Sequence, residues 1–199
     1  MRWLIDDFLD NISSKKIYFI VTICIIGFLI YSNTFSAPFI FDDIGNVYGN
    51  NALRQLNLLT QWWSPLKPRF LVYLTFLLNY KIAGWNIALY HITNLLIHIL
   101  TTFFVWRLVL LFFKTPIFLE SSISKHKKYI ALFCALIFLT HPIQTQAVTY
   151  IVQRFTELAA LFYILSIYFY IKARIKKSLS YFIFSIFSMI LGFWSKESA

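Results

Sequence analysis

The sequence predicts an all-α protein, a polytopic bundle of about five transmembrane helices with a helical juxtamembrane loop on the outer side. Hydrophobic residues make up 59% of the 199 residues, and charged residues only 13%. A soluble domain of this length leaves roughly 30% of the unfolded chain's surface in contact with water, so it cannot hide this many apolar side chains. A disordered chain would be far more polar. Both classes are therefore excluded.

Five apolar segments are the predicted spans, at about residues 17–36, 85–113, 129–147, 151–171 and 178–194. The first carries no charge over about 20 residues, which is enough to cross a bilayer. An acidic stretch precedes it, whereas a cleaved signal peptide begins with a short basic region, so we expect a retained helix.

Residues 37–84 form the predicted outer loop, which mixes Pro, Gly, Asn and charged residues with apolar ones. Within it, the stretch 69–80 (RFLVYLTFLLNY) is too short to span the membrane and predicts a helix at the interface.

The second span carries a polar stripe, because His91, Asn94 and His98 fall at i, i+3 and i+7 on one helix face. Such a stripe should face the protein interior or a wet cavity. Hydrogen bonds to neighbouring helices are the favoured interpretation, and metal binding through the two histidines is the alternative.

The net charge of +10 follows the membrane topology. Twelve of the 18 Lys and Arg residues fall in segments on the same side as the N-terminus, which places that end in the cytoplasm. The other six are Arg54, Lys67, Arg69, Lys81, Arg154 and Lys196. The positive charge therefore gives no reason to expect a nucleic-acid partner.

Ionisable residues gather on the predicted outer side, and such a cluster at one membrane face predicts a functional site. The acids are Asp42, Asp43, Glu157 and Glu197, and the nearby bases are Arg69, Arg154 and Lys196.

The adjacent carboxylates of Asp42 and Asp43 lie beside apolar residues just after the first span. Repulsion between like charges and apolar surroundings raise a carboxyl pKa, which suits a general base. The alternative is an ordinary turn or helix cap.

The basic residues on this side also have two interpretations each. Lys67 and Arg69 can bind a lipid phosphate or can simply anchor the interface. Arg154 and Glu157 are spaced i, i+3, so they can pair on one helix face, either as a structural pair or to hold Arg154 ready for an anion. Lys196, next to Glu197, is equally ambiguous.

Five segments in order carry a family resemblance: FDD at 41–43, RFLVYLTFLLNYKIAG at 69–84, YHITNLLIH at 90–98, HPIQTQAVTYIVQR at 141–154 with Glu157, and SKES at 195–198. Together they resemble the GT-C superfamily of polytopic glycosyltransferases, and more closely its tetratricopeptide-repeat-bearing branch of transmembrane O-mannosyltransferase-like proteins. The match extends along essentially the whole chain.

The resemblance implies a polyprenyl-phosphate-linked sugar as donor, and an acceptor hydroxyl on a protein or glycan at the non-cytoplasmic face. It implies that Asp42 or Asp43 is the catalytic base. The residues expected to bind substrate or stabilise the leaving phosphate are Arg69, His141, Arg154, Glu157, Lys196 and Glu197. Metal use stays open, because some members of the superfamily use a divalent cation and others none.

The chain departs from this family in length. It ends after the fifth predicted span and contains no 34-residue helical repeat, so we expect the N-terminal part of a longer enzyme. A non-catalytic membrane remnant or partner subunit is the alternative, and a transporter fragment is disfavoured because Gly and Pro number only 5 each. We expect a multi-pass protein of the bacterial plasma membrane, with the endoplasmic reticulum as the alternative.

Overall fold

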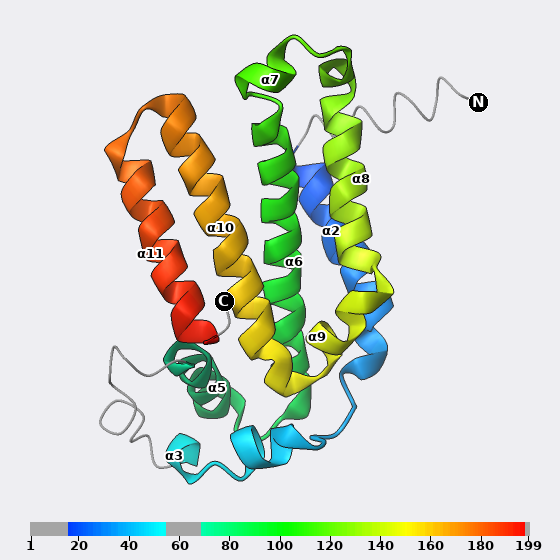
Figure 1. Cartoon of the computed structure of the whole chain (residues 1–199). Coiled ribbons are helices and arrows are strands. Elements are labelled where there is room, and N and C mark those ends of the chain that lie inside the picture. Colours follow the sequence, from blue (N-terminus) through cyan, green and yellow to red (C-terminus); the bar gives the residue numbers. More distant parts are fainter. Residues whose placement is uncertain (1–15, 55–68, 198–199) are drawn as a thin grey trace, which may run out of the picture.

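A computed structural model describes residues 16–54 and 69–197, and every regular element in these two ranges is helical (Figure 1). The longer helices are α2 (Lys16–Tyr31), α5 (Phe70–Ala83), α6 (Ile87–Phe112), α8 (Lys127–Thr140), α10 (Arg154–Lys176) and α11 (Leu179–Ser195). The short ones are α3 (Asn51–Arg54), α7 (Pro116–Leu119) and α9 (Thr145–Thr149). Single helical turns cover Ser32–Thr34, Ile44–Tyr48, Ser122–His126, Pro142–Gln144 and Ile151–Gln153.

The long helices form an up-and-down bundle. Figure 1 shows α2, α6, α8, α10 and α11 running between the two ends, with α5 beneath the lower end of α11. The α6–α7–α8 connection and the α10–α11 turn lie at one end. Residues 32–54, α5, α9 and the end of α11 lie at the other, which we call the lower end.

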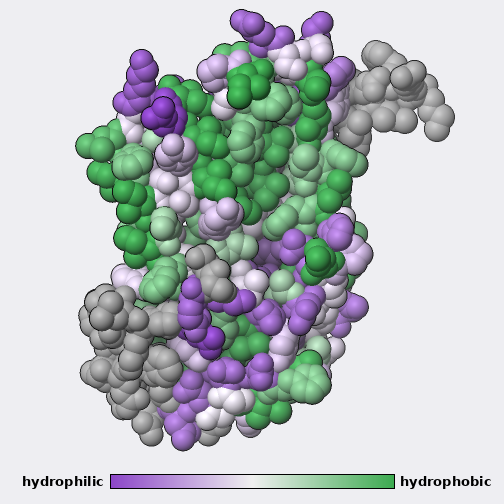
Figure 2. Space-filling view, viewed as in Figure 1, coloured by the Kyte–Doolittle hydropathy of each residue, from purple (hydrophilic) through white to green (hydrophobic). Residues whose placement is uncertain are grey.

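The predicted all-α polytopic bundle is confirmed. Within the described ranges, three helical segments are long and apolar enough to cross a membrane: Ile17–Thr34, Ile87–Phe112 and Ile151–Lys176. The bent pair Ser122–Thr140 and Pro142–Thr149 makes a fourth if it counts as one span, against the five that the sequence predicts. Figure 2 shows a broad apolar belt over the bundle with polar residues gathered at its two ends, as expected for an integral membrane protein.

The third predicted span, 129–147, is not one straight helix. Its axis bends by 46° between Thr140 and Pro142. Pro142 has no N–H to continue the helix, and its ring disfavours helical backbone at the residue before it, so His141 is extended. The carbonyl of Leu139, at the broken end, accepts hydrogen bonds from the Tyr31 hydroxyl (3.1 Å) and His98 Nε2 (3.2 Å).

The last two predicted spans also differ in length. The fourth, expected to end near residue 171, continues to Lys176 because Lys and Arg stems can extend along apolar surface while their charges reach water. The fifth is a 17-residue apolar helix, Leu179–Ser195, which is somewhat short for a crossing.

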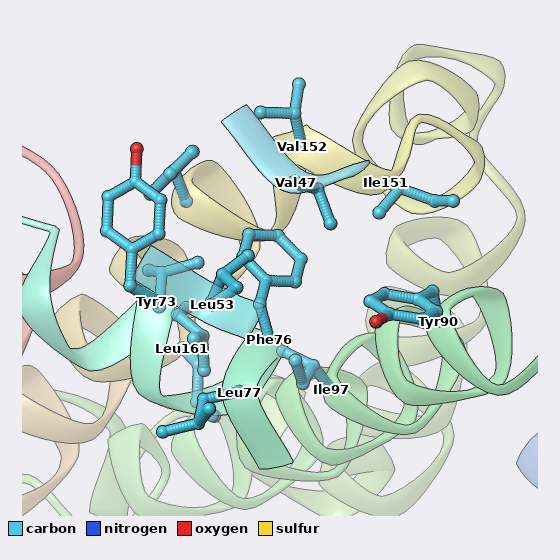
Figure 3. Packing of buried hydrophobic residues seen from close by; sticks show 13 residues of the cluster. Val47, Leu53, Tyr73, Phe76, Leu77, Tyr90, Ile97, Ile151, Val152 and Leu161 are labelled. Atoms are coloured by element: carbon cyan, nitrogen blue, oxygen red, sulfur yellow. The ribbon is translucent and has the colours of Figure 1, made fainter. Parts of the chain in front are cut away.

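A buried apolar cluster fixes the lower end of the bundle. Figure 3 shows side chains such as Leu53, Phe76 and Ile151, from three distant segments, packed together. Tyr90 on α6 belongs to the same cluster. Because burial of each such side chain contributes roughly 1.5–3 kcal/mol, this cluster holds α5 and residues 44–54 against α6 and the start of α10.

Candidate catalytic cleft

An open cleft of about 160 Å³ lies at the lower end of the bundle. Three segments far apart in the sequence meet there: the turn after α2, the start of α5 and the end of α11, around the first turn of α10. The lining residues are Asp42, Asn46, Arg69, Val152, Gln153, Phe155, Thr156 and Lys196. Three of the predicted site residues, Asp42, Arg69 and Lys196, are therefore brought together.

Asp42 has an exposed side chain at the wall of this cleft. Its backbone is held from two sides. The N–H of Asp42 donates to the Tyr150 hydroxyl at 2.9 Å, and its carbonyl accepts from the Asn46 amide at 3.0 Å. The carboxylate therefore sits on a fixed backbone and remains open to a ligand.

Asp43 points the other way and is only 1% exposed. Its carboxylate accepts the N–H of Val152 at 2.7 Å and that of Ile40 at 3.2 Å, so it joins the turn after α2 to the start of α10. Burial raises the pKa of Asp43, although these two hydrogen bonds and nearby His91 oppose the shift. Of the two causes expected from the sequence, the apolar surroundings have the largest effect on this pKa and repulsion from Asp42 the smallest.

The backbone is unusual at Arg69 in this cleft and at Phe41, the neighbour of Asp42. Phe41 has φ = 44° and Arg69 has φ = 72°, in the left-handed region that non-glycine residues rarely adopt. Such strain costs of order 1–3 kcal/mol per residue and concentrates at functional sites. At Phe41 it reverses the chain just before Asp42, with the Phe41 ring left 83% exposed.

Arg69 forms a bidentate ion pair with Glu197. Nε lies 3.0 Å from one carboxylate oxygen and Nη2 lies 3.0 Å from the other. The Arg69 guanidinium also lies 5.3 Å from the centre of the Phe155 ring. The pKa of Glu197 is lowered, first by a backbone hydrogen bond and then by the Arg69 side chain. Lys67, expected to act with Arg69, lies outside the described residues.

Lys196 follows the end of α11 and reaches α10. Its Nζ donates to the Thr156 hydroxyl at 3.0 Å, and that hydroxyl donates to the Gln153 side chain at 2.7 Å. Gln153 and Thr156 line the cleft but were not singled out from the sequence. Both lie in residues 140–158, a segment that is unusually polar for a connection between two spans, and this polarity is the sequence feature that could have pointed to them.

The sequence suggested that Arg154 joins Arg69 and Lys196 at the same site. Instead, Arg154 is completely buried and does not reach the surface of the cleft. Its guanidinium donates to neutral oxygens of α5 and α6. These are Asn94 Oδ1 (2.7 Å), Thr75 Oγ1 (3.2 Å), Asn79 Oδ1 (2.6 Å) and the Tyr90 carbonyl (2.9 Å). It also lies 4.3 Å from the centre of the Phe76 ring. In this arrangement no face of Arg154 is open to a ligand.

The expected pairing of Arg154 with Glu157 was wrong. Within the described ranges the one ion pair is Arg69–Glu197, and neither carboxylate oxygen of Glu157 has a hydrogen-bond partner. The i, i+3 spacing fails here because the Arg154 guanidinium is drawn toward α5 and α6. His141 is exposed outside the cleft, where its Nδ1 accepts the N–H of Ile143 and caps the turn after α8.

The polar stripe of α6 forms hydrogen bonds to other segments, which confirms the favoured interpretation. His91 Nε2 lies 3.0 Å from the Ala37 carbonyl. The Asn94 amide lies 3.3–3.4 Å from the carbonyls of Val148, Tyr150 and Ile151. The Val148 carbonyl belongs to the last turn of α9, and those of Tyr150 and Ile151 to the backbone between α9 and α10, so Asn94 ties this connection to α6. Across residues 16–54 and 69–197, no three His, Cys, Asp or Glu residues gather as metal ligands do.

Comparison with known proteins supports the resemblance read from the sequence. The chain is 34% identical over 160 residues to protein O-mannosyl-transferase TMTC2 of Homo sapiens, with 74% of this chain and 18% of that protein covered. It is 29% identical over 181 residues to TMTC3 of Homo sapiens, with 82% and 18% covered. It is 26% identical over 187 residues to Tmtc1 of Drosophila melanogaster, with 87% and 20% covered.

The chain thus spans about a fifth of the length of the curated relatives it matches. No protein-family profile matches it, and no solved structure does. The similarity to protein O-mannosyl-transferases extends over 74–87% of this chain.

Proposed function

We propose that this chain, a relative of the transmembrane protein O-mannosyl-transferases, forms the part of a membrane glycosyltransferase that holds its catalytic base. The complete enzyme transfers a sugar from a polyprenyl-phosphate donor to a hydroxyl of an acceptor protein, on the non-cytoplasmic side of the membrane. The observation that carries the proposal is the cleft that Asp42, Arg69 and Lys196 line together. The names of the relatives supply the reaction class.

Asp42 is the base in this proposal because its carboxylate lines the open cleft, whereas that of Asp43 is buried on two backbone N–H groups. Asp42 takes the proton of the acceptor hydroxyl while the oxygen of that hydroxyl forms a bond to C1 of the sugar. The bond from C1 to the phosphate oxygen breaks, and the polyprenyl phosphate leaves with the electron pair. Arg69 and Lys196 stabilise the negative charge on that phosphate. The Arg69 fork, which now holds the Glu197 carboxylate, is suited to two oxygens of a phosphate.

Substitution of the two aspartates tests the assignment. We expect Asp42→Asn to lower sugar transfer by roughly 100-fold or more, the range typical for loss of a general base. Asp43→Asn keeps one carbonyl oxygen as an acceptor, so we expect a loss of less than about 10-fold. The measurement is transfer of radiolabelled mannose from polyprenyl-phosphate mannose to protein, in membranes that contain the complete gene product at equal levels.

The pattern of results identifies which part of the proposal fails. Loss of transfer in Asp43→Asn alone would exchange the roles of the two aspartates. Full transfer in both variants would overturn the assignment of the base to either aspartate. Arg69→Gln and Lys196→Gln should lower kcat and raise the KM for the donor, because both remove a positive charge that binds the phosphate and stabilises the charge it gains on leaving.

A further inference from the structure

A second, smaller cavity of about 40 Å³ lies between α6, α9 and α10. Its polar lining residues are His98 and Thr101 of α6, Gln144 just before α9, and Thr156 and Glu157 of α10. Figure 1 shows α9 lying beside the lower parts of α6 and α10. The volume is enough for a small ion or a few waters, since about 10–15 Å³ holds one water, but not for a sugar.

Glu157 is the unusual member of this lining. Its side chain is only 5% exposed, and neither carboxylate oxygen has a hydrogen-bond partner. A buried ionised carboxylate without partners is very costly, so the group needs a cation, a proton or ordered water. Ionisable residues inside membrane spans are rare and commonly mark ion paths or binding sites.

Arg154 does not fill this role, although it lies on the same turn of α10. Its guanidinium is not within ion-pair distance of Glu157. Four neutral oxygens already accept from it, and the Phe76 ring lies against it. Arg154 is thus accommodated without Glu157, and the Glu157 oxygens remain available to another group.

The chemistry of the lining selects the ligand. The Glu157 carboxylate, the Thr101 hydroxyl and the Gln144 side-chain amide offer oxygen ligands, which suit hard cations, whereas the Thr156 hydroxyl is already bonded to Lys196 and Gln153. Only one lining residue is acidic, and Arg154 already adds a positive charge nearby. A monovalent ion adds less positive charge to this buried region, which already holds Arg154, than a divalent ion would. We propose that this cavity is a binding site for a monovalent alkali cation such as Na⁺, with Glu157 as its charged ligand.

Thermal unfolding of the whole chain in detergent micelles tests the site. Unfolding is followed in NaCl and in N-methyl-D-glucamine chloride at equal ionic strength, because the organic cation is too large for the cavity. We expect Na⁺ to raise the Tm by about 3 °C or more at saturation, since it binds the folded state alone. Glu157→Gln should abolish the difference. Glu120→Gln, the same change at an exposed acid at the other end of the bundle, should retain it.

Equal Tm values in the two salts would overturn the proposal, as would an undiminished Na⁺ effect in Glu157→Gln. A Tm that depends on pH and not on Na⁺ would indicate a protonated Glu157 and would also overturn it. If Glu157→Gln does not fold, Gln144→Ala replaces it, and the Na⁺ concentration for half the effect should then rise several-fold. None of these measurements uses sugar transfer, so the proposed glycosyltransferase function can fail or hold independently.

Discussion

Two polar regions meet around the first turn of α10, and they differ in how far their hydrogen bonds are satisfied. In the Arg154 cluster, the guanidinium and its partners on α5 and α6 are enclosed, and neutral oxygens satisfy four of its N–H groups. In the cleft, Asp42 is exposed, and the side chains of Arg69 and Glu197 are 42% and 49% exposed. Polarity within an apolar chain therefore does not mark function by itself. A charge that is enclosed and fully bonded holds helices together, whereas a charge that lines an opening is available to a ligand.

The largest expected effect comes from breaking the Arg154 cluster. Arg154→Met leaves the buried side-chain oxygens of Asn79 and Asn94 without a donor, so we expect a loss of roughly 3–5 kcal/mol in the free energy of unfolding. Denaturant unfolding in detergent micelles measures it. Arg174→Met on the exposed part of the same helix is the control and should change stability by less than about 0.5 kcal/mol. Equal losses in both variants would contradict the distinction between the two regions.

The sequence predicted the bundle and the side on which the ionisable groups gather, because hydropathy and the alternation of charged segments depend only on local composition. It could not separate Arg154 from Arg69. Both follow short polar segments, and their difference depends on α5 lying against α6 and α10, which is a long-range contact. The i, i+3 spacing of Arg154 and Glu157 likewise gives proximity along one helix, but it carries no information on competing acceptors from other helices.

The sequence left the roles of Asp42 and Asp43 open for a similar reason. Two adjacent acids look alike until the backbone direction is known. The positive φ at Phe41 and the N–H of Val152, which lies 109 positions beyond Asp43, send the two carboxylates apart. The break in the helix at His141-Pro142 is easier to predict from the sequence, because proline restricts the backbone of the residue directly before it.

An intermediate effect is expected from comparing these two aspartates. Asp43→Ala leaves the N–H groups of Ile40 and Val152 unpaired, so we expect a loss of roughly 1–3 kcal/mol. Asp42→Ala should cost less than about 0.5 kcal/mol, since the exposed carboxylate makes no comparable bond. Unfolding of both variants in micelles tests this contrast, and similar losses would contradict it.

The contribution of Asp43 to stability should also depend on pH. The pKa of Asp43 is raised in the folded protein, so the folded state holds that proton more tightly than the unfolded state does. The stability linked to this proton is fully present below the ordinary pKa of 3.8 and is lost as the pH rises through the folded value. The loss caused by Asp43→Ala should therefore be larger in acid than at neutral pH. A loss that grows toward neutral pH would contradict a raised pKa.

The smallest effect is expected at the Arg69–Glu197 ion pair. Both side chains are substantially exposed, so solvent screening should limit the coupling in a double-mutant cycle of Arg69→Gln and Glu197→Gln to less than about 1 kcal/mol. Salt near 1 M should remove most of it. Because the pKa of Glu197 is lowered, its contribution is present above the ordinary value of 4.5 and is lost as the pH falls through the folded value. A weak pair is what the proposed function requires, because Arg69 must exchange Glu197 for a phosphate at little cost. A coupling free energy of several kcal/mol that survives high salt would instead mean that Arg69, like Arg154, has a structural role in joining helices.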